Sequence, residues 1–246
     1  MKTDRVVVIT GAAGGIGSLL VRRFLTNDDT VIATDTAEEG LKKLRDAQVR
    51  DAKLHTVAGD ISNEEDCAKV ADLGRSTAGR VDVLVNVAGY FPVQSYDEMT
   101  AADFRKVVDI NLTGTFQMTK AVTPLLRGRG WARIVNMGSA SVFEGVADQV
   151  HYVAAKAGIF GLSRSLARVF GKDGITVNVV TPGLTVTPAV KAKMPPEMIE
   201  QQIKLRALPR EEQGGDLVGA VFFLASPDAD FITGQTVNVD GGKHML

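Results

Sequence analysis

Residues 6–17 read VVVITGAAGGIG, an apolar run that passes through a cluster of glycines into a segment with helical periodicity. The apolar run predicts a buried strand, and the apolar positions around Phe24 predict the helix that follows. Glycine lets the backbone turn tightly and approach a bound group closely, and the unpaired N–H groups at a helix start attract an anion. Gly11, Gly15 and Gly17 therefore indicate a phosphate-binding turn, although any tight strand-to-helix connection also uses glycine.

Short runs rich in valine and isoleucine recur along the whole chain, with helical segments between them. Strands that are apolar on both faces and alternate with helices are typical of a doubly wound parallel sheet with helices on both faces. No internal repeat or proline-rich linker divides the chain. We expect a single-domain α/β fold of the Rossmann type over residues 1–246, with these strands: Val6–Ile9, Val31–Ala33, Leu54–Ala58, Val81–Val85, Ile134–Met137, Ile175–Val180 and Thr236–Val239.

The composition limits the classes of partner and site. At 246 residues and 45% hydrophobic, the chain is long enough to bury a large single core. Its 28 basic and 29 acidic residues nearly cancel, so we expect no nucleic-acid or membrane partner. The single cysteine, Cys67, precludes an internal disulfide, and the first residues lack the pattern of a signal peptide, so we expect a cytoplasmic protein. No histidine stands at metal-ligand spacing from Cys67, and no metal site is expected.

Residues 184–210 interrupt the rhythm of strands and helices and carry four of the eight prolines. The segment follows the sixth predicted strand, so it lies at a carboxyl end of the sheet, where ligands bind in open α/β folds. We interpret it as a lid over the substrate. A surface excursion without function is the alternative.

Acidic residues end the second and third predicted strands. Asp35 stands where a carboxylate can accept hydrogen bonds from the adenosine ribose of a dinucleotide. It would repel a 2′-phosphate, and no cationic residue follows before Lys42, so Asp35 favours NAD over NADP. A strand-end turn or a helix cap is its alternative role. Asp60 is predicted either to accept from the adenine amino group or to cap the next helix.

Tyr152 and Lys156 stand four residues apart, and Ser139 precedes the tyrosine in a run of small residues. Positions i and i+4 lie on one face of a helix, so the ammonium can sit beside the phenol. An unperturbed phenol titrates near pH ~10, and a cation at ~4 Å in an effective dielectric of ~20 lowers its pKa by roughly three units. The spacing therefore predicts a tyrosine acid/base, although it also occurs by chance on amphipathic helices.

Over nearly its whole length the chain resembles the short-chain dehydrogenase/reductase family. The resemblance implies a seven-stranded sheet, a nicotinamide cofactor, and commonly a homotetramer in which the helices beginning near Ala101 and Tyr152 pack against copies of themselves. Val87 departs from the family pattern, which usually has a second asparagine there. The motifs are Thr10-Gly11-x-x-x-Gly15-Ile16-Gly17, Asp60-Ile61, Asn86-Val87-Ala88-Gly89, Asn111, Ser139, Tyr152-x-x-x-Lys156, and Pro182-Gly183 followed by Thr187.

The resemblance also implies the roles of the catalytic set. Tyr152 would exchange a proton with the substrate oxygen, and Ser139 would orient that oxygen. Lys156 would lower the phenol pKa and hold the nicotinamide ribose, while Asn111 would fix a water beside the lysine. The residues implied to contact the cofactor are Gly11, Gly14, Gly15, Ile16, Gly17, Asp35, Asp60, Ile61, Asn86, Ala88, Gly89, Tyr152, Lys156, Pro182, Gly183 and Thr187.

The residues expected to border the substrate are mostly apolar, which favours a medium-sized secondary alcohol or ketone. Several of these side chains have the alternative role of packing the lid onto the core. His151 is a rival candidate for the base, because an imidazole titrates near neutral pH, but adjacent helical positions point about 100° apart and it cannot share the face of Tyr152 and Lys156. A contact with the substrate or with a neighbouring subunit is its alternative role. The candidate substrate residues are Phe91, Ser141, Phe143, His151, Leu184 and Met194.

The leading hypothesis is an NAD-dependent alcohol dehydrogenase of the bacterial type. The runner-up is an NADPH-dependent 3-oxoacyl-(acyl-carrier-protein) reductase, for which Arg127, Arg129 and Arg133 would dock the acidic carrier. Asp35 weighs against that runner-up, because such reductases usually take NADPH. The remote alternatives are a nucleotide-binding protein without turnover and a cofactor-binding isomerase or dehydratase.

Overall fold

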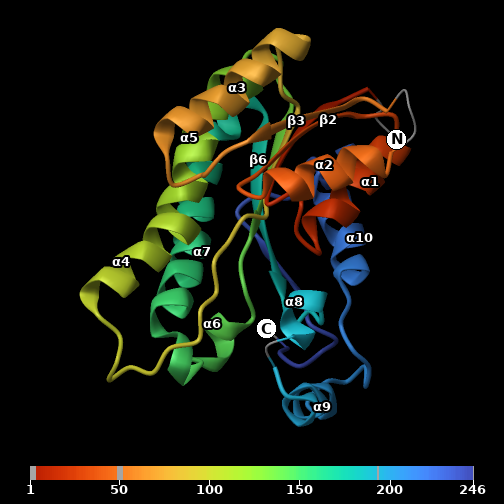
Figure 1. Ribbon diagram of the computed structural model, residues 1–246. Helices are drawn as coiled ribbons and strands as arrows, with labels where there is room; N and C mark the ends of the chain where they lie inside the picture. The colour runs from red at the N-terminus through yellow and green to blue at the C-terminus, as the bar shows by residue number, and fades with distance from the viewer. Residues whose placement is uncertain (1–3, 49–51, 193, 246) are drawn as a thin grey trace.

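The computed structural model describes residues 4–48, 52–192 and 194–245. Within them seven parallel strands form one sheet in the order β3-β2-β1-β4-β5-β6-β7 (Figure 1). The predicted fold class is therefore confirmed. The strands are β1 Val6–Thr10, β2 Thr30–Asp35, β3 Leu54–Ala58, β4 Val83–Asn86, β5 Ala132–Met137, β6 Ile175–Pro182 and β7 Thr236–Val239.

Each predicted strand matches an observed one, with small shifts at the ends. The fourth strand begins at Val83 rather than at Val81. Val81 donates its N–H to the carbonyl of Leu125, so it is held by the later helix Gly114–Leu126 and not by a neighbouring strand.

Helices cover both faces of the sheet (Figure 1). The helices α1, α2 and α10 pack on one face and α3, α5 and α7 on the other. A π-helical turn, Asp109–Thr113, joins α4 to α5. The helices are α1 Gly17–Thr26, α2 Glu38–Asp46, α3 Glu64–Ala78, α4 Ala101–Val108, α5 Gly114–Leu126, α6 Ser141–Glu144, α7 Val150–Phe170, α8 Pro188–Lys191, α9 Pro196–Lys204 and α10 Gly214–Leu224.

The first strand contributes to both hydrophobic cores, because its side chains point alternately to the two faces. Val7 and Ile9 pack with the α1 side of the sheet, and Val6 and Val8 pack with the α3 and α5 side. All four are buried. This explains why the run is continuously apolar and does not alternate.

The strand order reverses between β1 and β4, which creates a crevice at the carboxyl edge of the sheet. Residues 184–210 carry α8 and α9 at this edge, and the end of the chain lies near them and near α6 (Figure 1). None of the helices in the described ranges combines the length and the apolar character that crossing a membrane requires.

Candidate active site

The glycine-rich turn lies between β1 and α1 and presses against the end of β4. Gly11 has a φ of 63°, and an ideal Cβ there would lie 2.8 Å from the Ala88 Cα, so only glycine fits without strain. The Thr10 hydroxyl accepts hydrogen bonds from the N–H groups of Val87 and Ala88 at 3.0 and 3.1 Å. The predicted motifs around Gly11 and Ala88 are therefore neighbours in space.

The start of α1 offers unpaired donors. Gly14 donates to the carbonyl of Gly11, whereas within the described residues no hydrogen bond is made by the N–H groups of Gly15, Ile16 and Gly17. No acidic residue lies in the first turn and no side chain caps the helix. An anion placed here would meet free N–H groups and the positive end of the helix dipole.

Asp35 closes one side of this turn. Its carboxylate accepts from the N–H of Ala13 at 3.0 Å and from the N–H of Ala37 at 3.0 Å. The alternative role of Asp35 as a strand-end turn residue is therefore also present, and α2 has no side-chain N-cap. Each carboxylate oxygen can accept a further hydrogen bond, so the group keeps capacity for a ligand hydroxyl.

Asp60 folds back on its own loop. Its Oδ1 accepts from the N–H and the hydroxyl of Ser62 at 2.8 and 2.7 Å. The predicted alternative of a helix cap at Asp60 is wrong, because Asn63 caps α3 by accepting from the N–H groups of Glu65 and Asp66. The Ile61 side chain is buried in the core, which leaves only its backbone for a ligand.

The Asn86 side chain points into the protein. Its amide donates to Asn136 Oδ1 at 2.8 Å, and Asn136 donates to the Ser163 hydroxyl at 2.9 Å. These bonds join β4, β5 and α7 beneath the loop that carries Gly89. Asn86 therefore supports this loop through the core.

Ser139, Tyr152 and Lys156 come together where β5 ends against α7. The Ser139 hydroxyl hydrogen-bonds the Tyr152 phenol. Lys156 Nζ lies 5.7 Å from the centroid of the tyrosine ring and donates to the Met137 carbonyl at 2.9 Å. The predicted trio is thus assembled around one phenol.

Burial changes the expected titration of this trio. Burial raises the pKa of the Tyr152 phenol, and the hydrogen bond from Ser139 only partly offsets it. Burial also lowers the pKa of Lys156 to about 8. The expectation of a phenol with a lowered pKa is therefore not met by the chain alone, because burial disfavours the phenolate more than the hydrogen bond from Ser139 favours it.

Asn111 lies in the π-helical turn and clamps the loop after β4. Its amide donates to the carbonyls of Tyr90 and Val107 at 2.8 and 2.9 Å, and its Oδ1 accepts from the N–H of Tyr90 at 3.2 Å. An ideal Cβ on Gly89 would lie 2.9 Å from Asn111 Oδ1 and 3.6 Å from Lys156 Nζ. Asn111 and Lys156 thus face the same backbone position.

The segment from Pro182 to Thr187 leads from β6 towards the glycine-rich turn. An ideal Cβ on Gly15 would lie 2.9 Å from the Thr187 Cγ2, so the base of the lid touches that turn. The N–H of Gly183 donates to Glu212 at 3.1 Å.

Glu212 and Arg206 were not singled out in the sequence. Glu212 accepts from the Thr185 hydroxyl at 2.6 Å, and Arg206 donates to the Leu184 carbonyl at 2.9 Å. The two charges lie 3.7 Å apart, and both side chains are buried. Burial raises the pKa of Glu212 above its ordinary value. No motif indicated this pair, because its partners lie on the irregular lid.

The residues expected to border the substrate lie at different distances from the catalytic trio. The ring of Phe91 lies 6.5 Å from that of Tyr152, and the Ser141 hydroxyl donates to that of Ser139 at 2.8 Å. Phe143, Leu184 and Met194 are partly buried on α6 and the lid. The His151 imidazole is fully buried and accepts from the N–H of Tyr152, so we leave it out of the substrate wall.

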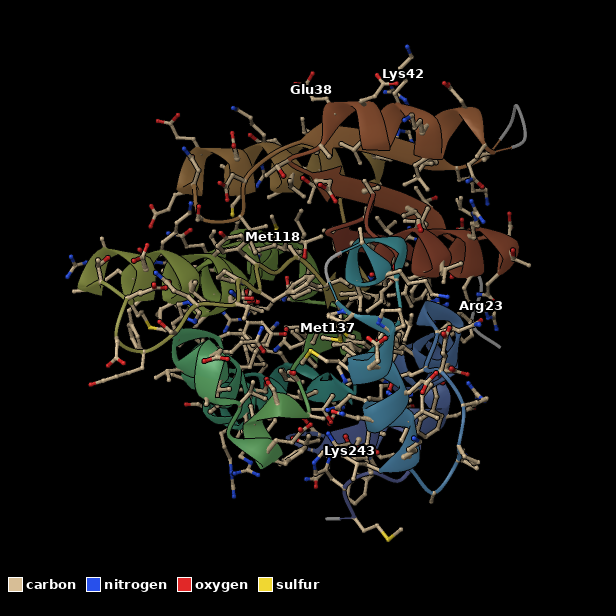
Figure 2. All side chains as sticks on the ribbon, turned by 60° about the horizontal axis from the view of Figure 1, so that its bottom comes forward. Arg23, Glu38, Lys42, Met118, Met137 and Lys243 are labelled. Atoms are coloured by element: carbon tan, nitrogen blue, oxygen red, sulfur yellow. The ribbon has the colours of Figure 1, made fainter. Side chains whose placement is uncertain are left out.

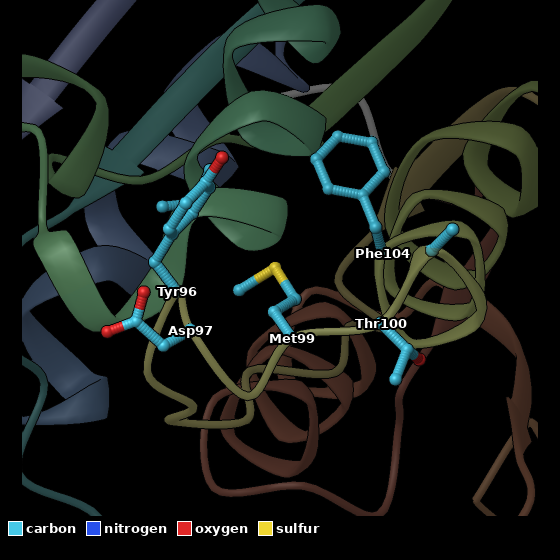
Figure 3. Close-up of a pocket in the computed structure, with 7 residues that line it drawn as sticks. Tyr96, Asp97, Met99, Thr100 and Phe104 are labelled. Atoms are coloured by element: carbon cyan, nitrogen blue, oxygen red, sulfur yellow. The ribbon is translucent and has the colours of Figure 1, made fainter.

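A pocket of about 480 Å³ opens beside the loop before α4. Tyr96, Met99 and Phe104 point into it (Figure 3). None of Ser139, Tyr152 and Lys156 lines it. The pocket is therefore separate from the catalytic trio.

The predicted carrier-docking arginines are not a free cationic cluster. Arg133 is buried and paired with Asp230, and Arg127 is paired with Asp173 at 2.9 Å. Arg127 and Arg129 precede β5, so they lie at the amino edge of the sheet, whereas Ser139 follows its carboxyl end. This surface is unsuited to deliver a substrate to the trio.

Among the described residues, no group of three or more His, Cys, Asp or Glu side chains is arranged to hold a metal ion. Cys67 is buried, and burial raises the pKa of its thiol to about 11.

The residues at the crevice fit a dinucleotide. The free N–H groups at the start of α1 suit a pyrophosphate, and the Asp35 carboxylate beside Ala13 suits ribose hydroxyls. Gly11, Gly15 and Gly89 let the backbone pack closely against Ala88, Thr187 and Asn111, where a Cβ would collide, so the segments around the crevice are held close together.

Comparisons with known proteins agree with this arrangement. The family model described as Enoyl-(Acyl carrier protein) reductase matches residues 11–244. A 3-oxoacyl-(acyl-carrier-protein) reductase of Salmonella typhimurium is 34% identical over 245 residues, which are 98% of each protein. A levodione reductase of Leifsonia aquatica is 33% identical over 252 residues, covering 98% of this chain and 94% of the relative.

Comparison with solved structures points to the same kind of protein. A crystal structure described as short-chain dehydrogenase/reductase, glucose/ribitol dehydrogenase, from Brucella melitensis has a TM-score of 0.94 at 30% identity. It covers 99% of this chain and 98% of its own. The chain therefore belongs to the short-chain dehydrogenase/reductase family, a family of oxidoreductases that act on CH–OH or keto groups with a nicotinamide cofactor.

Proposed function

We propose that the protein is an NAD-dependent dehydrogenase of a medium-sized, mainly apolar secondary alcohol. The observation that carries the proposal is the Tyr152 phenol, which is hydrogen-bonded to Ser139 and has the Lys156 ammonium 5.7 Å from its ring centroid. Tyr152 is partly buried and its oxygen is held on one side by Ser139, which leaves the other side for the substrate oxygen. As the phenolate it can accept the hydroxyl proton, and as the phenol it can donate that proton in the reverse direction.

The chain's own groups have distinct tasks in this chemistry. A bound nicotinamide would accept or supply the hydride. Tyr152 would take the hydroxyl proton in the oxidative direction and return it in the reductive direction. Ser139 would hold the substrate oxygen beside the phenol, and Ser141, which donates to Ser139, would fix the direction of that hydroxyl. Lys156 would hold a proton near the phenol, because its pKa of about 8 lies close to neutral pH.

Asp35 supports NAD as the preferred cofactor. Its carboxylate is fixed by Ala13 and Ala37 at the edge of the dinucleotide crevice. Lys42 and Glu38 project from the outer surface of α2 (Figure 2). Lys42 is exposed there, so it leaves the repulsion between Asp35 and a 2′-phosphate uncompensated.

The apolar character of Phe91, Phe143, Leu184 and Met194 supports a substrate with an alicyclic or aromatic body. The similarity to a protein named levodione reductase agrees with an oxidoreductase of this kind. The second candidate is NADPH-dependent reduction of a 3-oxoacyl thioester, favoured by the similarity to the carrier-protein reductase. The paired and buried arginines weaken that candidate.

The deciding experiment measures formation of reduced cofactor from NAD+ or NADP+ with a panel of secondary alcohols of aliphatic, alicyclic, aromatic, polyol and hydroxyacyl types. Turnover with NAD+ on one apolar class supports the proposal. NADPH-dependent reduction of acetoacetyl-CoA, with no alcohol oxidised in the presence of NAD+, would replace it by the second candidate. Cofactor binding without turnover of any panel member would favour a nucleotide-binding protein.

A further inference from the structure

The end of the chain lies between the two walls of the proposed substrate pocket. One wall is α6, which follows directly from Ser139, and the other is the lid with α9. The chain approaching Met245 lies near α6 and α8, on the side where α9 is found (Figure 1), and Lys243 is seen between α6 and the lid (Figure 2). The last described residues therefore sit where the two walls meet.

Lys243 joins these walls directly. Its ammonium lies 2.7 Å from a carboxylate oxygen of Glu144 on α6 and donates to the side-chain oxygen of Gln202 on α9 at 2.6 Å. The Lys243 side chain is only 9% exposed, and that of Glu144 is 29% exposed. Charge-assisted hydrogen bonds of this kind are stronger than bonds between neutral groups, and they are screened less when solvent is excluded.

A rigid turn presents this lysine. Asp240 accepts from the N–H groups of Gly242, Lys243 and His244 at 3.0 to 3.1 Å, and its Oδ2 lies 2.7 Å from His244 Nδ1. Asn238 holds the carbonyl of His244 at 3.0 Å. Burial alone would raise the pKa of Asp240, but hydrogen bonds from Asn238, His244 and Gly242 outweigh it and lower the pKa. The carboxylate that shapes the turn is therefore ionised at neutral pH.

The same turn touches the apolar part of the pocket. The ring of His244 lies 5.8 Å from that of Phe143, which lies 5.8 Å from that of Phe160 on α7. Phe143 is two residues beyond Ser141, whose hydroxyl donates to Ser139. Displacement of the turn would thus loosen the aromatic wall as well as the lid.

From this arrangement we propose that Lys243 is a specificity-determining positioning residue, which links Glu144 on α6 to Gln202 on α9 and so fixes the width of the substrate pocket. The inference rests on the proposed function, because it concerns the same pocket. The ammonium is already neutralised by Glu144, so it acts as a link and not as a receptor for a substrate carboxylate. An intact link favours compact alcohols over bulky ones.

The test uses Lys243→Met, which keeps the aliphatic stem, and Glu144→Gln, a milder change at a more exposed partner. Lys53→Met is the matched control, because Lys53 is also paired with a carboxylate, Asp28 at 3.0 Å, but at the amino edge of the sheet. For the best compact alcohol we expect KM to rise about tenfold in Lys243→Met, with kcat changed less than about twofold, since one charge-assisted link is lost and no reacting group is. The ratio of kcat/KM for bulky over compact alcohols should rise in both variants.

The double variant Lys243→Met/Glu144→Gln tests whether the two residues act through the same contact. Its KM should be no higher than that of the worse single variant, because both substitutions break the same contact. Effects that add, or a KM shift no larger than that of Lys53→Met, would overturn the proposal. Loss of activity on anionic substrates alone in Lys243→Met would also overturn it and make the lysine a substrate receptor.

A readout without turnover separates this inference from the proposed function. Limited proteolysis by trypsin within residues 184–210 should be faster in Lys243→Met and Glu144→Gln than in the wild type, and unchanged in Lys53→Met. If no alcohol is oxidised, the proposed function fails while faster cleavage still supports the link. If alcohols are oxidised and cleavage is unchanged, the link fails alone.

Discussion

The cofactor side and the substrate side of the crevice are held together by different forces. On the cofactor side, the Thr10 hydroxyl and the Asp35 carboxylate bind backbone N–H groups, and Gly11 allows close backbone contact. On the substrate side, the buried Glu212 and the nearly buried Lys243 hold an irregular lid through charged side chains. The first side is a rigid frame set by the ends of the strands, whereas the second depends on a few charges.

Tyr152 lies where the cofactor side meets the substrate side, and Tyr152→Phe should have the largest effect on activity. Removal of the phenol oxygen deletes the acid/base, so kcat should fall about a thousandfold or more. Binding of the cofactor should hardly change, because the glycine-rich turn and Asp35 are untouched. Steady-state kinetics and a cofactor titration by fluorescence check the two parts. Retained turnover would refute the role of the phenol.

Glu212→Leu should destabilise the substrate side of the crevice. It leaves Arg206 buried without its carboxylate and removes the acceptor for Gly183 and Thr185, so we expect the free energy of unfolding to fall by about 3–5 kcal/mol. Denaturant unfolding measures this loss. The double substitution with Arg206→Met should recover much of it.

A matched surface change calibrates that result. Lys53→Met removes a pair in which both side chains are well exposed, so it should lower the free energy of unfolding far less than Glu212→Leu does. Equal losses in Glu212→Leu and Lys53→Met would show that the buried pair does not hold the lid.

The sheet and the cofactor side were predictable from sequence for a physical reason. Strands buried on both faces and a glycine-rich turn are local patterns, and the four-residue spacing of Tyr152 and Lys156 places them on one face of α7. Of the two roles that the sequence leaves open for Asp60, the helix cap is excluded, because Asp60 and Asn63 both have side chains that can cap and only the loop geometry selects Asn63.

The substrate side could not be predicted in this way. Lys243 and Glu144 are about a hundred positions apart, and no local periodicity indicates their contact. Arg133 looked like a surface cation, but it is buried against Asp230 and over the ring of Trp131. The titration of Tyr152 was also misjudged, because the spacing shows a nearby cation and does not show how deeply both groups are buried.

The burial of Lys156 can be tested through the pH dependence of the free energy of unfolding. Its pKa is about 8 in the folded protein, against 10.5 for an ordinary lysine. Between these values the unfolded chain binds more protons than the folded one, so the free energy of unfolding should rise with pH above 8. A rise of about 2 kcal/mol is expected by pH ~9.5, below the ionisation of ordinary tyrosines. Unfolding in denaturant at several pH values measures it.

Lys156→Met removes the titrating group and should abolish this rise, whereas Lys53→Met should keep it. A wild-type curve that is flat from pH 8 upwards would contradict the lowered pKa of Lys156. A rise that persists in Lys156→Met would assign the titration to another group.

Asp35→Ser tests the cofactor side with the smallest expected effect. Serine keeps an acceptor for the N–H of Ala13 or Ala37 but removes the charge that would repel a 2′-phosphate. The ratio of kcat/KM for NAD+ over NADP+ should fall about tenfold, the change expected from one lost charge at a half-exposed site. The ratio for bulky over compact alcohols should stay constant, because the lid and Lys243 are unchanged. A shift of both ratios would show that the two sides of the crevice are energetically coupled, and an unchanged cofactor ratio would mean that Asp35 serves only as the turn residue at the end of β2.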